Sequence, residues 1–288
     1  MTNADYVAPK NLSETLSVLE KWKGKVQLIA GGTNVVPNLR AKALGKEILI
    51  DLSHLKNLSY IKEEKKRIRI GSLTTMSEIA ASKTIRSKAC ILSEAVWQIG
   101  NPLVRNRATI AGNLADASPA ADSAVPLLVL DASVVVEKQK SKPKQIPIDQ
   151  FFLGSRKTVL RRDELIREIV FSKPNPFARM AYSKFGLRNA MAISVVSAGM
   201  LVEMEKGKCK KARIALGAVA PTPRRAYGVE KFLEGHVITE AIIDQCCEAV
   251  QEEIQPITDV RATAEYRRSM ASVLLKRLLQ QIFSQGHV

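Results

Sequence analysis

The sequence predicts a mixed α+β protein made of two domains, and three observations support this. The chain has 288 residues, which is long for one compact domain, and its 46% hydrophobic content is enough for packed cores. Its first segment alternates helix and strand patterns, whereas later segments have the pattern of antiparallel strands followed by helices. A Pro-Asn-Pro cluster at 174–176 interrupts the pattern, so we place the domain boundary there, between residues 1–174 and 175–288.

The N-terminal segment predicts a small parallel α/β unit. Asn11 is a typical helix N-cap, with Glu14 three residues later as its capping-box partner, and Gly24 ends the helix. Val26–Ala30 and Ile48–Leu52 are short apolar runs, which is the pattern of buried strands. The order helix, strand, loop, strand indicates that the two strands are parallel.

The middle segment has a different pattern. Alternation around Ile68 and Ile70 indicates a half-buried strand, and two helices are predicted over 77–81 and 85–99. Ser118 as N-cap and Pro119 at the first helical position predict a third helix, which carries apolar residues as far as Leu130 into the core. Further strands are predicted over Ala132–Glu137, Gln145–Ile148 and Glu164–Phe171.

The C-terminal segment predicts an antiparallel sheet followed by two helices. Gly207 marks the turn of a hairpin between the last two predicted strands. The strands are expected over Met180–Phe185, Ala192–Glu203 and Cys209–Val219, and the helices over Thr239–Ile254 and Ala264–Phe283.

The charge is strongly positive, at +16 with a pI near 9.8. The basic runs Lys62–Arg69 and Lys138–Lys144 lie between strand-like segments, so we expect exposed hairpin tips. Aromatic residues are only 5% and do not interleave with these runs, which favours a solvated surface or an acidic protein partner over nucleic acid. No apolar stretch is long enough to span a bilayer, and the polar segment Met1–Pro9 lacks a signal sequence, so we expect a cytoplasmic protein without a membrane span.

The four cysteines show no metal-binding or disulfide pattern. No pair has CxxC spacing, and Cys246 and Cys247 are adjacent, which suits neither a standard disulfide nor a shared metal cage. We expect reduced thiols, and no iron–sulfur cluster or other metal bound by this chain.

The first candidate ligand site is Ala30-Gly31-Gly32-Thr33-Asn34, directly after a predicted strand. Two glycines let the backbone turn sharply with several N–H groups pointing the same way, which is an arrangement that binds anions such as phosphates. The alternative is a tight turn without a ligand, because glycine pairs are common in turns.

The second candidate is Thr109-Ile110-Ala111-Gly112-Asn113, interpreted as a glycine turn with hydrogen-bonding side chains at both ends. Small residues continue through Ala124, which lets a ligand or another surface approach the backbone. Asp122 is expected in the first turn of the helix that begins at Pro119; the alternative for this residue is a favourable interaction with the helix dipole alone.

Several classes of chemistry are disfavoured. The sequence lacks GxxxxGK[ST], the full GxGxxG, a GxSxG elbow and an evident Cys–His pairing, so no acid–base or nucleophilic constellation is visible. Two phosphate-binding loops without such a constellation suit a redox cofactor that carries a pyrophosphate, since the cofactor then supplies the chemistry.

IAGGTN at 29–34 and TIAGNLADASPAAD at 109–122 resemble the paired flavin motifs of the FAD-binding medium subunits of molybdenum hydroxylases, such as carbon monoxide, xanthine and nicotinate dehydrogenases. The resemblance extends over nearly the whole chain. It includes Tyr6–Pro9, Tyr182–Phe185, Ala192–Val195 and Ala264–Arg268.

This resemblance implies a fold. A two-lobed FAD-binding domain of the PCMH, or vanillyl-alcohol-oxidase, type would have lobes at about 1–56 and 57–174. A CO-dehydrogenase-flavoprotein-type α/β domain would follow at 175–288.

The resemblance also implies roles for individual residues. The pyrophosphate would be wrapped by Leu28, Ile29, Ala30, Gly31, Gly32, Thr33, Asn34 and Val35, and the second FAD loop would consist of Thr109, Ile110, Ala111, Gly112 and Asn113. Asp122 would bind ribityl or ribose hydroxyls, Gly100 would lie along the cofactor, and Leu165 and Lys184 would contact it from the far lobe. Neither motif contains histidine or cysteine, so FAD is expected to be non-covalent.

Two positions depart from the family pattern. Asn34 stands where Asp or His-Ser is common, and Ala111 stands where Gly is common. An alanine at positive φ would be strained by about 1 kcal/mol or more, so we expect a negative φ at Ala111 and retained FAD binding.

In this family, substrate is hydroxylated at a molybdenum cofactor in a large subunit. Electrons pass through [2Fe–2S] clusters in a small subunit to FAD, and then to an acceptor such as NAD⁺. The resemblance therefore implies both partner subunits, with molybdopterin and the clusters bound only by them. Two alternatives stay open: a stand-alone flavin oxidase or reductase of the same fold, and a basic binding protein that has lost FAD.

Overall fold

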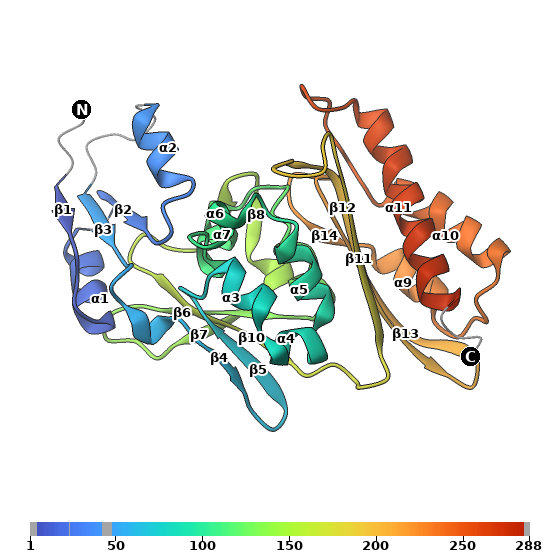
Figure 1. The fold of residues 1–288 in the computed structure, drawn as a ribbon, viewed down its shortest axis with the longest axis horizontal. Coiled ribbons are helices and arrows are strands. Elements are labelled where there is room, and N and C mark those ends of the chain that lie inside the picture. The colour runs from blue at the N-terminus through green and yellow to red at the C-terminus, as the bar shows by residue number, and fades with distance from the viewer. Residues whose placement is uncertain (1–4, 23, 42–47, 285–288) are drawn as a thin grey trace.

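The computed structural model describes residues 5–22, 24–41 and 48–284. It divides the chain into three consecutive regions, each with its own sheet, which follow one another along the long axis of the molecule (Figure 1). Residues 1–4 of the polar opening segment lie outside the described residues.

The N-terminal region is a three-stranded parallel sheet of order β1-β3-β2, which confirms the predicted parallel unit. Its helix begins after Asn11, whose side chain accepts from the Glu14 N–H at 2.9 Å. β2 is half-buried rather than buried as predicted, because it is an edge strand of a small sheet. The elements are β1 (Tyr6–Val7), α1 (Leu12–Lys21), β2 (Val26–Ile29), α2 (Val35–Arg40) and β3 (Ile48–Asp51).

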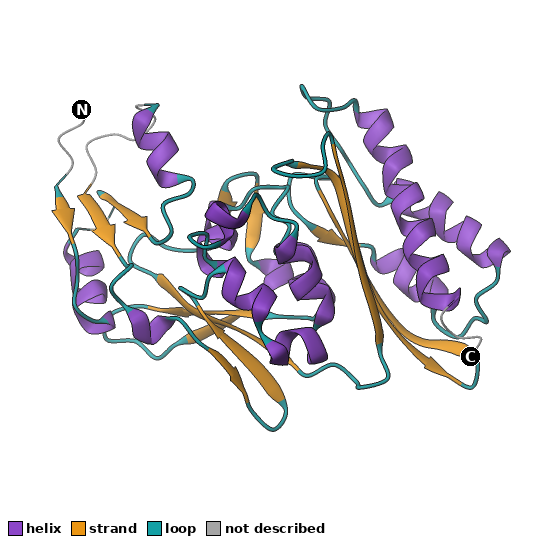
Figure 2. Cartoon of the chain, in the orientation of Figure 1, coloured by secondary structure: helices purple, strands orange, loops and turns teal. Residues whose placement is uncertain are grey.

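The middle region is a five-stranded antiparallel sheet of order β4-β5-β10-β6-β7, with helices packed on one face (Figure 2). Ile68 and Ile70 point from β5 into that core and are fully buried. The strands are β4 (Ile61–Glu63), β5 (Arg67–Gly71), β6 (Ser133–Glu137), β7 (Lys144–Pro147) and β10 (Leu165–Ser172), with a small ribbon of β8 (Phe152–Gly154) and β9 (Lys157–Thr158). The helices are η1 (Lys56–Leu58), α3 (Met76–Ala81), α4 (Lys83–Lys88), α5 (Cys90–Trp97), α6 (Pro102–Arg105), α7 (Ile110–Asp116), α8 (Ala124–Val129) and η2 (Ile148–Gln150).

The prediction of one continuous helix over 85–99 was wrong, because the chain breaks at Ala89 into α4 and α5. Ile85 and Ile91 are both fully buried. Because they are six residues apart, their side chains would point about 120° away from each other around the axis of a single helix. The break lets both reach the core.

The prediction of a helix beginning at Pro119 was also wrong, because α8 begins at Ala124. The segment before it turns back on itself, with the Ala121 N–H donating to the Ser118 carbonyl at 3.0 Å. The Pro119 carbonyl accepts from the Ala218 N–H of the C-terminal region at 2.8 Å. Contacts with the next region thus replace the expected helical turn.

The C-terminal region is a four-stranded antiparallel sheet covered by helices (Figure 1). The three predicted strands are present and antiparallel, whereas β14 was not predicted. Gly207 forms the predicted hairpin turn with φ +76°, and Thr239 caps α10. The prediction omitted α9. The elements are β11 (Arg179–Gly186), β12 (Ser194–Glu205), β13 (Lys208–Gly217), β14 (Arg224–Arg225), α9 (Tyr227–Leu233), α10 (Glu240–Glu252) and α11 (Ala264–Ser284).

The middle and C-terminal regions are closely packed through α8, whose six residues are all buried. Gly199 of β12 and Gly217 of β13 lie against Val125: a Cβ atom added at either would lie within 3.1 Å of its side chain. Glycine at these positions lets the strands approach the helix.

In the described part of the chain, no helix combines the length and apolar character needed to cross a membrane. Likewise, the described residues contain no group of three or more His, Cys, Asp or Glu placed to hold a metal ion. The four cysteines are unpaired thiols, as predicted.

Candidate functional site

The first predicted loop connects β2 to α2 through a glycine in a left-handed conformation. Gly32 has φ +74°, a conformation that favours glycine, and its carbonyl accepts from the Val36 N–H at 2.9 Å. No described residue accepts a hydrogen bond from the amides of Gly31, Gly32, Thr33 or Asn34. These N–H groups are therefore available to an anionic ligand.

This loop packs directly on the backbone that precedes the second motif. A Cβ atom added to Gly31 would lie 1.8 Å from the Arg107 carbonyl oxygen, which only glycine avoids. Thr75 and Thr109 also form an isolated antiparallel bridge. The two predicted segments are thus brought together, although about 75 residues separate them in the sequence.

A pocket of about 140 Å³ opens where the two segments meet. Lys56 and Arg107 are exposed cations at its lining, and neither forms an ion pair with an acidic residue in the described part of the chain. Two unpaired cations beside unpaired amides favour a ligand with more than one negative charge. The lining residues are Ala30, Gly31, Ser53, Leu55, Lys56, Ser59, Leu73, Thr75, Asn106, Arg107 and Thr109.

The second segment differs from the predicted glycine turn, because Ile110–Asn113 is the first turn of α7. Its amides are engaged within the chain: Ile110 donates to the Thr74 carbonyl at 3.0 Å and Ala111 to the Ser72 carbonyl at 3.2 Å. Gly112 donates to the Thr109 hydroxyl at 3.2 Å, which caps the helix. The interpretation of this segment as a second phosphate-binding array of amides was therefore wrong.

Ala111 fits this helix without strain. It lies in the first turn of α7, is buried, and does not have the positive φ that would penalise alanine, as predicted. The Asn113 side chain is held by the Ser123 hydroxyl, which donates to Asn113 Oδ1 at 2.5 Å.

Asp122 and Lys184, two predicted cofactor contacts, form a buried ion pair with Lys184 Nζ 2.5 Å from Asp122 Oδ2. The Tyr182 hydroxyl donates to Asp122 Oδ1 at 3.1 Å, and the Ser194 hydroxyl donates to the same oxygen. Burial and the Asp122 charge raise the pKa of Tyr182 well above its usual range, so the phenol keeps the proton that it donates. The carboxylate joins the segment before α8 to β11 and β12.

Neither Gly100 nor Leu165 lines the pocket, although Leu165 shares a core cluster with the lining residues Leu55 and Leu73. Gly100 has φ +51°, and its carbonyl accepts from the Met191 N–H at 3.3 Å. Leu165 is buried in the small core under the N-terminal sheet. The pocket therefore contains residues of both motifs but not these two, Asp122 or Lys184.

The sequence reasoning missed Lys56 and Arg107. Arg107 lies two residues before the second motif, which was a usable signal, because a cation beside a glycine-bearing loop suits phosphate binding. Lys56 gave no signal, since only the fold brings η1 to the pocket.

The fold and the first loop are those expected of a two-domain protein with a site for a phosphate-bearing cofactor. Residues 2–174 match the family described as the FAD binding domain in molybdopterin dehydrogenase, and residues 181–282 match the CO dehydrogenase flavoprotein C-terminal domain. The chain belongs to this family of FAD-binding oxidoreductase subunits, which confirms the predicted resemblance and two-domain fold.

Two curated relatives match over almost their whole length. The nicotinate dehydrogenase FAD-subunit of Eubacterium barkeri is 30% identical, with 99% of this chain and 98% of the relative covered. The carbon monoxide dehydrogenase medium chain of Hydrogenophaga pseudoflava is also 30% identical, with 98% and 97% covered.

Solved structures agree with the sequence comparison. A carbon monoxide dehydrogenase structure from Hydrogenophaga pseudoflava matches with a TM-score of 0.94 and 29% identity, covering 98% of this chain and 97% of that one. Quinoline 2-oxidoreductase from Pseudomonas putida 86 matches with a TM-score of 0.91 and 25% identity, covering 98% and 97%.

Proposed function

We propose that this chain is the electron-transferring flavoprotein subunit of a molybdenum hydroxylase and binds FAD without covalent attachment. The observation that carries the proposal is the loop at 31–34. Its backbone amides have no acceptor among the described residues, and its Gly31 packs against the Arg107 carbonyl. This arrangement suits the diphosphate of FAD. FAD supplies electron-transfer chemistry when bound, and the chain binds, orients and shields it.

Each predicted residue receives a role consistent with its position. Leu28–Val35 surround the diphosphate, with Lys56 and Arg107 as added counter-charges. Thr109–Asn113 contribute close packing and side chains rather than amides, because those amides are engaged. Gly100, Asp122, Leu165 and Lys184 are proposed to contact the remainder of FAD. The Asp122 carboxylate does so while it also accepts from Lys184.

The proposed complex contains a molybdopterin-binding large subunit and a small subunit with [2Fe–2S] clusters, in the cytoplasm. Electrons reach FAD from the small subunit and leave to an acceptor such as NAD⁺. The net charge of +16 complements more acidic partner subunits. Assembly should weaken as salt rises from low to high, because salt screens such attraction. Assembly that is indifferent to salt contradicts the role of charge.

The direct test is the visible spectrum of the purified chain, followed by acid precipitation. We expect the two absorption bands of oxidised flavin and their complete release into the supernatant, since the attachment is non-covalent. Well-folded protein without these bands favours the alternative of a basic binding protein. Flavin that stays with the precipitate contradicts non-covalent binding.

The acceptor and the stand-alone alternative have separate tests. Anaerobic addition of NAD⁺ to the dithionite-reduced complex should restore the oxidised bands if NAD⁺ is the acceptor. A tagged chain should co-purify with molybdopterin-binding and iron–sulfur subunits. A chain that purifies alone and reduces oxygen with its own substrate favours the stand-alone oxidase.

A further inference from the structure

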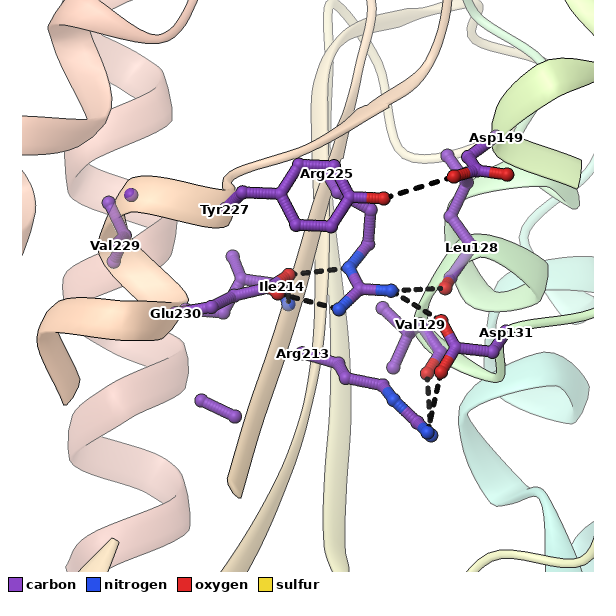
Figure 3. Close-up of polar contacts among 12 residues, drawn as sticks. Leu128, Val129, Asp131, Asp149, Arg213, Ile214, Arg225, Tyr227, Val229 and Glu230 are labelled. Carbon is purple, nitrogen blue, oxygen red and sulfur yellow. Dashed lines mark hydrogen bonds and ion pairs between the residues drawn. The ribbon is translucent and has the colours of Figure 1, made fainter. Parts of the chain in front are cut away.

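The C-terminal region holds α8 at both of its ends. At the N-terminal end, Asp122 pairs with Lys184 of β11. At the C-terminal end, Arg213 Nη2 and Arg225 Nη1 each lie 2.5 Å from an Asp131 carboxylate oxygen (Figure 3). Arg225 and Arg213 also donate to the Leu128 and Val129 carbonyls in the last turn of α8, at 3.4 and 3.5 Å. Nearer the middle of the helix, Gly199 and Gly217 pack against the Val125 side chain, and such apolar contacts have no preferred direction along the helix.

The charged group at the C-terminal end is well organised. Arg225 forms a two-pronged pair with Glu230, with Nε 2.5 Å from Oε1 and Nη2 2.6 Å from Oε2. Glu230 also accepts from the Ile214 N–H at 2.7 Å, and the Tyr227 ring lies 4.9 Å from the Arg225 guanidinium carbon. Figure 3 shows Tyr227 reaching across to Asp149, to which its hydroxyl donates at 3.2 Å. The arginine is therefore held in position before it meets Asp131.

Asp131 has a left-handed backbone conformation, which glycine and asparagine adopt more readily than aspartate. It follows α8 with φ +47°, at a position where helices often place glycine or asparagine. The aspartate carboxylate at this position receives two arginines, which glycine cannot do. Arg225 and Glu230 are nearly buried, and buried charges are poor stabilisers because they lose water. A positional role accounts for them better than a stabilising one.

We propose that Asp131, Arg213, Arg225 and Glu230 form a positioning latch that fixes the C-terminal region along α8, so that Lys184 meets Asp122 at the other end. The latch acts on the cofactor only through Lys184, and this part rests on the proposed function. The residues are positioning residues: none of them lines the pocket at the first loop.

The first test measures docking without reference to FAD. Asp131→Asn removes the charge but tolerates the left-handed backbone. Single-amide hydrogen exchange in the full-length chain should show about tenfold faster exchange at Ala218, whose acceptor Pro119 lies at the far end of α8. Gly235, which donates to Cys209 inside the C-terminal region, is the internal control and should not change. Unchanged exchange at Ala218 overturns the proposal.

The second test asks whether the latch acts through Lys184. Asp131→Asn should weaken FAD binding about tenfold in the native background and not at all in a Lys184→Met background. An equal loss in both backgrounds overturns the link. If the native chain binds no FAD, the proposed function fails, and the exchange measurement still decides whether the latch sets docking.

Two further variants complete the experiment. Lys276→Met removes an exposed ion pair with Asp244 inside the C-terminal region and should change neither readout. If Asp131→Asn does not fold, Arg213→Met takes its place, because it leaves Arg225 paired with Asp131 and Glu230. The same outcomes at Ala218 then support or overturn the latch.

Discussion

The two glycine-bearing segments look alike in sequence and differ in structure. In Gly31–Asn34, no described residue accepts from the four amides, and Gly32 needs a positive φ. In Ile110–Asn113, every amide donates within the chain, and Gly112 is an exposed helical residue. A glycine in a segment of small residues thus indicates that another part of the chain or a ligand approaches the backbone closely. Whether a ligand can bind that backbone depends on whether its N–H groups already donate within the chain.

The difference assigns separate tasks to the two segments. The first presents hydrogen-bond donors, and the backbone just before the second supports the first loop, through the contact of Gly31 with Arg107. Asp122, further along the second segment, extends this support to the C-terminal region through Lys184. Variants that separate donors from support therefore sharpen or break the comparison.

The largest expected effect is on the support. Lys184→Met leaves the buried Asp122 charge without its cation, so the free energy of unfolding should fall by about 3 kcal/mol in thermal or denaturant unfolding. The double variant Asp122→Asn, Lys184→Met should recover much of this loss, because no unpaired charge remains. Lys210→Met, at an exposed pair with Glu205, is the control and should leave the unfolding midpoint in place. A Lys184→Met protein as stable as the native chain contradicts a supporting role.

The next effect is at the contact between the segments. Gly31→Ala places a methyl group on the Arg107 carbonyl and should lower the free energy of unfolding by about 2 kcal/mol, since the backbone must move apart. FAD content should fall with it, because the loop leaves its position. Gly154→Ala adds a methyl group to a glycine with no neighbour within 4 Å and serves as the matched control. Equal stability of the two variants would mean that the segments do not touch as described.

A smaller effect is expected on the pH dependence of stability, at Asp259. This residue belongs to neither segment, so the effect separates fold stability from cofactor binding. Burial alone would raise the pKa of Asp259, but hydrogen bonds from Arg261 and Arg267 lower it to about 2. A lowered pKa contributes stability above the unfolded value of 3.8, and this stability is lost as pH falls through about 2. Asp259→Asn should cost about 1 kcal/mol at neutral pH, after allowance for solvent screening, and should flatten acid unfolding between these pH values. An unchanged acid-unfolding curve would contradict this.

The sequence was informative where local chemistry decides the structure. Asn11 caps its helix and Gly207 turns its hairpin as predicted, and the helix predicted from Thr239 begins one residue later, at Glu240. The domain boundary at 174–176 stays a prediction.

It was less informative where distant contacts decide. Pro119 has the local chemistry of a helix start, but its carbonyl binds Ala218, about 100 residues away. The amides of α7 look free in sequence, yet their acceptors are the carbonyls of Ser72 and Thr74. Asp122 was recognised as a site residue, whereas its pairing with Lys184 required the fold. Hydrogen-bond partners that come from remote strands cannot be read from a local pattern.

The most direct measurement is FAD titration of the apoprotein in two matched variants, Gly32→Ala and Gly112→Ala. Gly32→Ala forces a side chain into positive φ at a cost of about 1 kcal/mol and disturbs the unpaired amides, so FAD affinity should fall at least about tenfold. Gly112→Ala places a methyl group 2.8 Å from the Thr109 hydroxyl that caps α7, so this side chain must shift and affinity should fall by about threefold, less than in Gly32→Ala. Equal losses in both variants, or a larger loss at Gly112, would contradict the assignment of the diphosphate to the first loop.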